Sequence, residues 1–298
     1  MAPRIVVAGS ANMDLVGLAP RLPQPGETVL GDEFVMMAGG KGANQAIAAA
    51  RAGGHAVFLG AIGSDAFGVT IKARLNASGV DTGNLRTSYG SSGVAVIMVD
   101  RAGENSILVS PGANNTFAGL SAAEAAVIAE SDVLLCQQEI PTDTVVAAGR
   151  AARTGGTRMI LNAAPARELP PELLEVVDLL VVNEGEAVAI TGTPEPDLPA
   201  LLELVPRVVL TLGGNGSWYA DRDGRDERIP AFPVDVVDTT AAGDAFTGAL
   251  AVAWGEGRDL IAAVRWASAA GAACVRTVGA SNSLPARADI DTLYARYA

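Results

Sequence analysis

The chain has 298 residues, of which 49% are hydrophobic and only 4% are aromatic, and its formal net charge is −12. An acidic surface repels phosphate backbones, so we expect no nucleic-acid partner, although backbone amides and a divalent metal can still hold a nucleotide. His55 is the only histidine, which excludes Ser-His-Asp and Cys-His catalysis and multi-histidine metal sites, so a general base must be a carboxylate, a lysine or a tyrosine.

The cysteines and the chain start bear on the cellular compartment. Cys136 and Cys274 lie far apart in apolar contexts, which favours buried free thiols in a reducing cytosol over a disulfide. The N-terminus has too short an apolar run for a signal peptide, and no uncharged apolar stretch reaches membrane-spanning length. We therefore expect a cytoplasmic protein with no membrane partner.

Short aliphatic runs alternate with helical patterns along the chain. The predicted strands are Arg4–Ala8, Val57–Ile62, Val133–Cys136, Arg158–Asn162, Leu179–Asn183 and Arg207–Leu212. The predicted helices are Gly42–Ala52, Asp65–Ser78, Ser121–Ser131, Thr142–Thr154, Glu184–Thr191, Ala242–Trp254, Asp259–Val275 and a last one from about Ala288 to the end. This alternation predicts βαβ units and a parallel sheet covered by helices, in one α/β domain over residues 1–298.

Two regions, about 15–37 and 88–109, show extended patterns without intervening helices. In the second, Val94–Val99 is followed by a polar turn and then by Ser106–Val109, which predicts a β-hairpin. Its strands are apolar on both faces, so we expect one face to close over a ligand and the other to meet a partner subunit. An ordinary sheet edge is the alternative.

Asp244 is the strongest candidate for a catalytic residue. It follows three small residues, Ala241, Ala242 and Gly243, at the start of a predicted helix, where backbone amides can approach an anion closely. A carboxylate there can take a proton from an attacking hydroxyl while the amides stabilise the charge on a transferred phosphoryl group. Alternatively, Asp244 only complements the helix dipole and the small residues only permit tight packing.

Two motifs carry a family resemblance. Asp238–Phe246 resembles the C-terminal signature of the PfkB (ribokinase-like) carbohydrate kinases, commonly Asp-Thr-x-Gly-Ala-Gly-Asp, with Ala241 in the glycine's place as in members that phosphorylate ribose. Met36–Ala46 resembles the family's glycine-rich motif, in which Gly40, Lys41 and Asn44 would contact a sugar. The Walker pattern is absent, so Lys41 is not a P-loop lysine.

The resemblance implies a fold and a reaction. The fold would be a three-layer α/β/α sandwich with a mostly parallel central sheet and a small β-sheet lid formed by the regions 15–37 and 88–109. The reaction would be ATP-dependent phosphorylation of D-ribose at its 5-hydroxyl. Alternatives are another PfkB sugar or nucleoside kinase acting on deoxyribose, fructose, 2-keto-3-deoxygluconate or adenosine, and a non-catalytic sugar sensor. A Rossmann dehydrogenase is rejected because no Gly-x-Gly-x-x-Gly follows the first strand.

Further site residues are implied by the same resemblance, most of them at predicted strand ends, where open α/β sheets bind ligands. The sugar would also be held by Asn12, Asp14 and Glu139. Mg²⁺, bound with ATP, would be held through water by Asn183 and Glu186. The nucleotide would contact Asn183, Thr211, Gly213, Gly214, Asn215, Gly216, Gly243 and Ser268. Individually, each could be a routine cap or turn.

The resemblance also implies a monovalent activator and a partner. K⁺ would be held by Asp238 and Thr240 in one loop and by Cys274, Thr277, Gly279 and Ser283 in a second. Alternatively, Asp238 simply caps the helix region and the second loop is an ordinary turn. Family members often pair through the lid, so we expect a homodimer.

Overall fold

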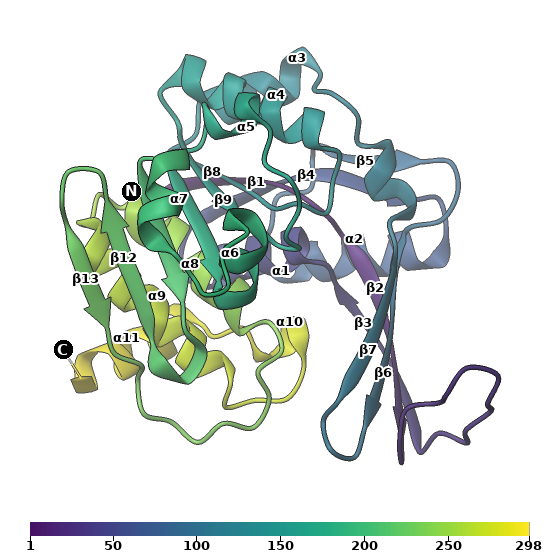
Figure 1. Ribbon diagram of the computed structural model, residues 1–298. Helices are drawn as coiled ribbons and strands as arrows, with labels where there is room; N and C mark the ends of the chain where they lie inside the picture. Colours follow the sequence, from purple (N-terminus) through teal and green to yellow (C-terminus); the bar gives the residue numbers. More distant parts are fainter. Residues whose placement is uncertain (298) are drawn as a thin grey trace.

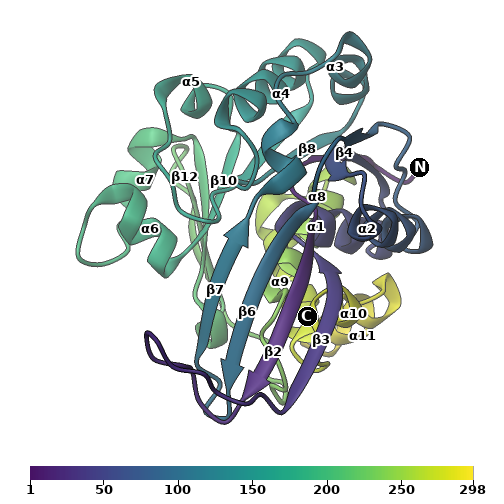
Figure 2. The same cartoon turned by 90° about the vertical axis from the view of Figure 1, so that its right-hand side faces the viewer.

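Two sheets organise residues 1–297, the part of the chain that the computed structural model describes (Figures 1 and 2). Among these residues the central sheet has nine strands, in the order β13-β12-β11-β10-β9-β8-β1-β4-β5. They are β1 (Arg4–Ala8), β4 (His55–Gly63), β5 (Leu85–Ser88), β8 (Val133–Cys136), β9 (Arg158–Asn162), β10 (Leu179–Asn183), β11 (Arg207–Thr211), β12 (Ser217–Asp221) and β13 (Asp226–Ile229). In this spatial order, every pair of neighbouring strands from β11 to the β5 edge is parallel, whereas β12 is antiparallel to both β11 and β13. The predicted mostly parallel sheet is confirmed.

Helices cover both faces of this sheet (Figure 1). One face packs against α1 (Lys41–Arg51), α2 (Ala66–Ala77), α8 (Ala242–Gly255), α9 (Leu260–Cys274) and α11 (Arg287–Tyr297). The short α10 (Ala280–Ser283) lies against α1. The other face packs against α3 (Ala122–Ala129), α4 (Thr142–Gly155), α5 (Pro171–Leu174), α6 (Glu184–Thr191) and α7 (Leu198–Leu204). Because side chains alternate along a strand, Ile5 and Val7 of β1 enter the first core and Val6 and Ala8 the second. The three-layer sandwich is confirmed.

Most long predicted elements end within two residues of their predicted bounds. Asp65 and Ser121 lie just outside α2 and α3 as N-caps, because their side chains accept hydrogen bonds from first-turn amides. The end of the predicted last helix, at Ala298, lies outside the described residues. The sequence interpretation missed β5, β12, β13, α5, α7 and α10, since such short segments carry too few residues to show a period.

A separate small sheet projects from the body (Figure 2). In the described chain it has four strands in the order β3-β2-β6-β7: β2 (Asn12–Ala19), β3 (Glu33–Gly39), β6 (Gly93–Asp100) and β7 (Asn105–Ser110). The predicted hairpin is present, since β6 pairs antiparallel with β7. The strands β2 and β6 run parallel, which brings the two regions expected to form a lid into one sheet.

The two faces of the small sheet differ. Residues that pair directly opposite one another on neighbouring strands place their side chains on the same face of the sheet. One face therefore carries Leu15, Met36, Val96 and Leu108, together with Phe34 and Met98. We call this the outer face, and Phe34 and Leu108 on it are 61% and 66% exposed. The inner face carries Asn12 and Asp14 together with Ala95, Ile97 and Val109. The cover expected over the outer face is not supplied by the described chain itself.

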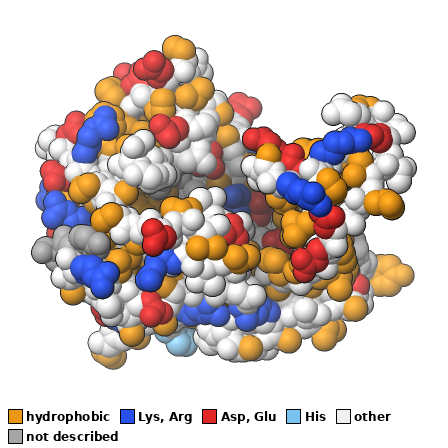
Figure 3. Space-filling view, turned by 90° about the horizontal axis from the view of Figure 1, so that it is seen from below, with side chains coloured by type: hydrophobic (Ala, Val, Ile, Leu, Met, Phe, Trp, Pro, Cys, Tyr) orange, Lys and Arg blue, Asp and Glu red, His pale blue; other side chains and the backbone are white. Residues whose placement is uncertain are grey.

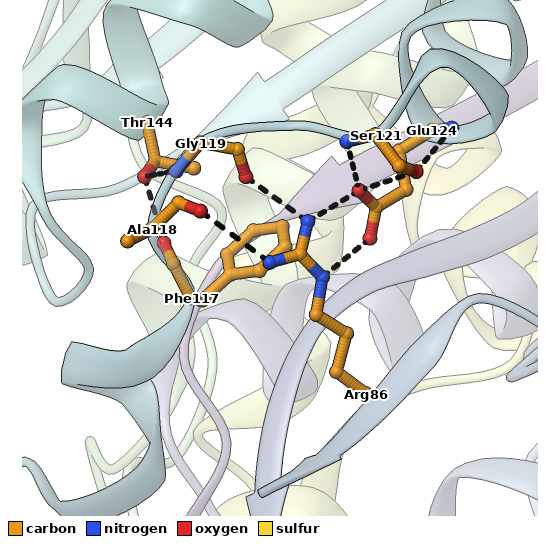
Figure 4. A network of polar contacts seen from close by, with 7 residues as sticks. All are labelled: Arg86, Phe117, Ala118, Gly119, Ser121, Glu124 and Thr144. Atoms are coloured by element: carbon orange, nitrogen blue, oxygen red, sulfur yellow. Dashed lines mark hydrogen bonds and ion pairs between the residues drawn. The ribbon is translucent and has the colours of Figure 1, made fainter.

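A polar network anchors the chain where it returns from the small sheet (Figure 4). After β7 the chain forms a 3₁₀ turn, Gly112–Thr116, and then passes Arg86 of β5. The Arg86 guanidinium donates to Glu124 and to the carbonyls of Ala118 and Gly119, and it lies 4.6 Å from the centre of the Phe117 ring. This network ties the segment after the 3₁₀ turn to the edge of the central sheet.

The two cysteines are buried and free, as predicted. Cys136 packs in one core and Cys274 in the other, so the sheet separates them. Within residues 1–297, no helix combines the length and the apolar character needed to cross a bilayer.

Candidate active site

The predicted site residues gather at the carboxyl edge of the central sheet. The strands β1, β8, β9, β10 and β11 all end at this edge, because they run parallel. The helices α1 and α8 begin beside it, next to the base of the small sheet. Figure 3 looks into the hollow between the body and the small sheet, where acidic and basic side chains gather.

Asp244 lies in the first turn of α8 and is almost fully buried. Its Oδ2 accepts a hydrogen bond from Asn44 Nδ2 at 3.0 Å, and its Oδ1 accepts one from Gln45 Nε2 at 2.9 Å. Burial raises the pKa of Asp244 above its usual value, while Lys41 and the two amide donors act in the opposite direction. A buried carboxylate with a raised pKa is a suitable proton acceptor for a hydroxyl group.

The first turn of α8 begins with a strained backbone. Ala241 has φ 61° and is the one non-glycine residue with positive φ in the described chain. This conformation costs an L-residue about 1–2 kcal/mol and turns the chain sharply into the helix. Ala242 N donates to Thr239 O at 3.2 Å, so among the described residues the first-turn amides without a protein acceptor are those of Gly243 and Asp244.

Asn44 holds a buried acceptor that has no partner among the described residues. Because its Nδ2 donates to Asp244, its amide orientation is set, and its Oδ1 is buried without a hydrogen-bond partner among the described residues. A buried acceptor without a partner carries a free-energy penalty that a ligand hydroxyl group would remove. Of the predicted sugar contact Asn44, one amide hydrogen is therefore used within the protein and the acceptor is left unpaired.

Carboxylates surround Lys41 at the N-terminus of α1. Glu139 Oε2 accepts from Ser10 Oγ at 2.5 Å and from Lys41 N at 3.1 Å. Burial would lower the pKa of Lys41, but Asp244, Glu139 and Glu186 raise it above its usual value. Burial, together with Glu139 and Asp244, raises the pKa of Asp14 to about 7. The structure therefore brings the predicted sugar-binding acids together around one cation.

Asn12 is held by a residue that the sequence interpretation missed. Asn114, in the 3₁₀ turn after β7, accepts from Ala11 N at 2.9 Å and donates to Asn12 Oδ1 at 2.7 Å. Nothing in the local pattern marks Asn114, because its partners lie about a hundred positions earlier. A side chain at Gly93 would lie 2.1 Å from Asn12 Oδ1, so the start of β6 also packs on this pair.

Gly39 and Gly40 let the backbone approach these side chains. A Cβ at Gly39 would lie 2.0 Å from the carboxylate of Asp14, and one at Gly40 would lie 2.8 Å from Asn12 N. Gly40 also has φ 89°, a conformation that favours glycine. The glycine pair of the predicted motif is therefore required by close packing against Asn12 and Asp14.

The predicted nucleotide residues line the carboxyl edge on the other side of α8. Asn183 and Glu186 form a capping box at the start of α6, in which each side chain accepts from the other's backbone amide. Thr211 ends β11, and the residues Gly213–Asn215 form a 3₁₀ turn. Ser268 of α9 lies 3.3 Å from Ser217, next to Gly216, and also donates to Val264 O.

The two loops predicted to hold K⁺ lie side by side. Asp238 Oδ1 accepts from the backbone and side chain of Thr240, and its Oδ2 accepts from Gly279 N at 2.8 Å. Cys274 Sγ lies 3.1 Å from Ser283 Oγ and 3.7 Å from Thr240 O. Thr277 N donates to Cys274 O, which shapes the second loop as a turn. One carboxylate thus joins both loops.

A cavity of about 390 Å³ lies at the opposite, amino edge of the central sheet, away from these residues. It is lined by Arg158, Asp178, Arg207, Tyr219, Asp221, Asp223, Arg225, Trp254, Arg258, Asp259 and Leu260. Its arginines and aspartates balance in charge, and Arg225 is paired with Asp259. None of the predicted site residues lines it.

Comparisons with known proteins identify the family and the fold. The model of the pfkB family carbohydrate kinases matches residues 2–287. The chain is 40% identical to a ribokinase of Bacillus subtilis over 97% of this chain and 98% of that protein. It is 38% identical to a ribokinase of Haemophilus influenzae over 96% of this chain and 97% of that protein. The fold is similar to that of Arabidopsis thaliana ribokinase complexed with ribose and ATP, with a TM-score of 0.93, 34% identity and 99% of each chain covered.

Proposed function

This chain belongs to the pfkB family of carbohydrate kinases and phosphorylates ribose with ATP, and we propose that it transfers the γ-phosphoryl group to the 5-hydroxyl with Asp244 as the base. The observation that carries this proposal is the buried Asp244 carboxylate in the first turn of α8, beside the unpaired Asn44 Oδ1. A non-catalytic sensor would not need a base held in this way.

The proposed step is a direct displacement. The sugar hydroxyl loses its proton to Asp244 as its oxygen bonds to the γ-phosphorus, and the bond from that phosphorus to the bridging oxygen of ADP breaks. The amides of Gly243 and Asp244, which have no protein acceptor among the described residues, would stabilise the transferred group, while Ala241 and Ala242 form the turn that places them. Lys41 would add a positive charge on the sugar side.

The sugar would lie between the body and the inner face of the small sheet. Asp14 and Glu139 would accept hydrogen bonds from sugar hydroxyl groups, and Asn44 would offer its unpaired acceptor. Asn12 has its Oδ1 occupied and so would offer its Nδ2 as a donor. Gly40 and Lys41 would contribute close backbone contacts. The apolar side chains Ala95, Ile97 and Val109 share the face of Asn12 and Asp14, which supports a lid over the sugar.

The nucleotide would lie along the ends of β10 and β11. Its contacts would come from Asn183, Thr211, Gly213, Gly214, Asn215, Gly216, Gly243 and Ser268. The turn after β11 and the free amide of Gly243 face this edge, which supports the placement.

A divalent cation such as Mg²⁺ accompanies ATP in kinases and neutralises phosphate charge. Asn183 and Glu186 would hold it through water. The capping box uses only Glu186 Oε2, and burial raises the pKa of Glu186. Within residues 1–297, no cluster of three or more His, Cys, Asp or Glu side chains could hold a metal, which fits a cation that keeps its waters and takes phosphate ligands.

A monovalent cation and a second subunit complete the proposal. K⁺ would be bound by Asp238, Thr240, Cys274, Thr277, Gly279 and Ser283. The contact between the two loops through the Asp238 carboxylate supports this assignment. The exposed apolar outer face of the small sheet supports a homodimer, because such patches usually mark an interface. A cytoplasmic location stays a prediction.

The acceptor is tested by a coupled ADP-release assay with ribose, deoxyribose, fructose, adenosine and 2-keto-3-deoxygluconate. We expect the highest kcat/KM with ribose. A higher value with any other acceptor would replace ribose while leaving the kinase assignment intact. Binding of ribose without ADP release would favour a sensor.

A further inference from the structure

Gln45 lies in the first half of α1, directly against Asp244, and is completely buried. Its Nε2 is 2.9 Å from Asp244 Oδ1 and 2.9 Å from Asn162 Oδ1, so both of its hydrogens are donated. Its Oε1 accepts from Gln137 Nε2 at 2.6 Å. Three of its four hydrogen-bonding positions are therefore in use inside the protein.

The direction of these hydrogen bonds is set by the backbone of the central sheet. Val181 O in β10 can only accept, and Asn162 Nδ2 donates to it at 3.2 Å. Asn162 must then present its Oδ1 to Gln45, and Gln45 must present its Nε2. A flipped Gln45 amide would place its oxygen against the oxygens of both Asn162 and Asp244, which is unfavourable. This series of hydrogen bonds from Val181 O through Asn162 and Gln45 therefore leaves the Gln45 Nε2 donor facing Asp244.

Close packing of α1 and α8 keeps Gln45 at this distance. A Cβ at Gly248, one helical turn after Asp244, would lie 2.7 Å from Gln45 O and 2.6 Å from Ala48 Cβ. The two helices can approach so closely because position 248 has no side chain. Neither helix can then shift without breaking the hydrogen bond between Gln45 and Asp244.

We propose that Gln45 is a positioning residue for the base, which holds Asp244 Oδ1 in place and leaves the carboxylate's remaining lone pairs for the proton of the sugar hydroxyl. This proposal rests on the proposed role of Asp244. Asn44 holds the other oxygen, but it is also a proposed sugar contact, whereas the side-chain hydrogen bonds of Gln45 are to other protein groups. Gln45 thus acts through Asp244 and makes no contact with substrate.

The ionisation of Asp244 depends on several neighbours. Lys41 on α1 favours the charged form, whereas Glu139 after β8 disfavours it. Asp14 on β2, Glu186 on α6 and the thiol of Cys274 on α9 also interact electrostatically with Asp244. The hydrogen bond from Gln45 favours the charged form, so its loss raises the pKa of Asp244 further.

The test compares Gln45→Met with Gln138→Met. Gln138 is also buried, but neither its Oε1 nor its Nε2 has a partner among the described residues, so its replacement removes no hydrogen bond from the base. Activity with ribose is measured between about pH 5 and pH 9. We expect Gln45→Met to lower kcat about 10- to 100-fold, the scale of a hydrogen bond to a charged group, and to change KM for ribose less than about threefold.

We also expect the acid limb of the pH profile to move to higher pH in Gln45→Met and to stay in place in Gln138→Met. A folded Gln45→Met enzyme whose kcat and acid limb match those of Gln138→Met would overturn the proposal. If Gln45→Met does not fold, the isosteric Gln45→Glu gives a second reading. The introduced carboxylate and that of Asp244 would share a proton, which moves the acid limb of the pH profile to higher pH. An acid limb at the same pH as in the parent would overturn the proposal.

A measurement without sugar separates this proposal from the proposed function. The infrared carboxylate band of Asp244, identified by its loss in Asp244→Asn, is titrated in the parent and in Gln45→Met. A higher midpoint in Gln45→Met supports the positioning role even if the parent fails to phosphorylate ribose. An unchanged midpoint overturns the positioning role even if the parent is an active kinase.

Discussion

The substitution Asp244→Asn should abolish most catalysis while leaving the protein folded. It replaces one carboxylate oxygen by an NH₂ group without changing the size of the side chain. Both oxygens of Asp244 accept from amide donors, so the new NH₂ must face either Asn44 Nδ2 or Gln45 Nε2. Asn44 is the residue that can turn, because its Oδ1 has no partner in the described chain, whereas Gln45 is held by Asn162 and Gln137.

The magnitudes follow from these contacts. Loss of a general base lowers kcat by about 10²–10⁴, which equals about 2.7–5.5 kcal/mol of barrier. The turned Asn44 would offer a donor in place of an acceptor to the sugar, so KM for ribose should also rise. Removing a buried charge stabilises the native state, while a remaining donor–donor contact costs about 1–3 kcal/mol, so the two effects on stability oppose each other.

The assay combines ADP release at saturating ribose and ATP, calorimetric binding of ATP and a thermal melt. We expect ATP affinity close to that of the parent, because most of the proposed nucleotide contacts lie at the ends of β10 and β11, and Gly243 would contribute a backbone amide that the substitution leaves in place. A folded Asp244→Asn enzyme that keeps more than about a tenth of the parent kcat would refute the assignment of Asp244 as the base.

Four further outcomes are expected. Activity in Tris or Na⁺ buffer should rise when K⁺ is added, and Asp238→Asn should lose this response. An activity that does not respond to K⁺ at any ribose concentration would contradict the potassium proposal. Sedimentation of the parent at micromolar concentration should show a dimer. Val96→Asp on the outer face should dissociate this dimer, and Val69→Asp, at an exposed position on α2, should leave it intact. A monomeric parent would contradict the homodimer. Ala241→Gly should raise the free energy of unfolding by up to about 1.6 kcal/mol, because relieved strain of about 1–2 kcal/mol opposes an entropic cost of glycine of about 0.4–1 kcal/mol. A lower free energy of unfolding in denaturant titrations would argue against the strain. Asp14→Asn should raise the Tm above pH 7, because the ionised carboxylate of Asp14 is penalised in the folded state. This gain in Tm should shrink as the pH falls from about 7 toward 3.8. A gain in Tm that grows on acidification would contradict the raised pKa, and KM for ribose should be higher than in the parent at every pH.

The sequence by itself identified the elements and motifs that a local pattern can encode. Four strand predictions, Arg4–Ala8, Val133–Cys136, Arg158–Asn162 and Leu179–Asn183, coincide with β1, β8, β9 and β10. Buried parallel strands are continuous aliphatic runs, and polar residues that interrupt them mark the carboxyl edge where ligands bind. Asp244 could be selected for the same reason, because small residues before a helix are a local feature.

Only the tertiary structure decided how these residues act. Gln45 stands in the motif from which Gly40, Lys41 and Asn44 were interpreted as sugar contacts, yet its partner Asp244 lies 199 positions later. The unpaired Asn44 Oδ1, the raised pKa of Asp14 and the separation of the small sheet into an inner and an outer face all depend on contacts between distant segments. Hydrogen-bond direction and ionisation are set by neighbours in space, and a local sequence pattern holds no information about which neighbours the fold will supply.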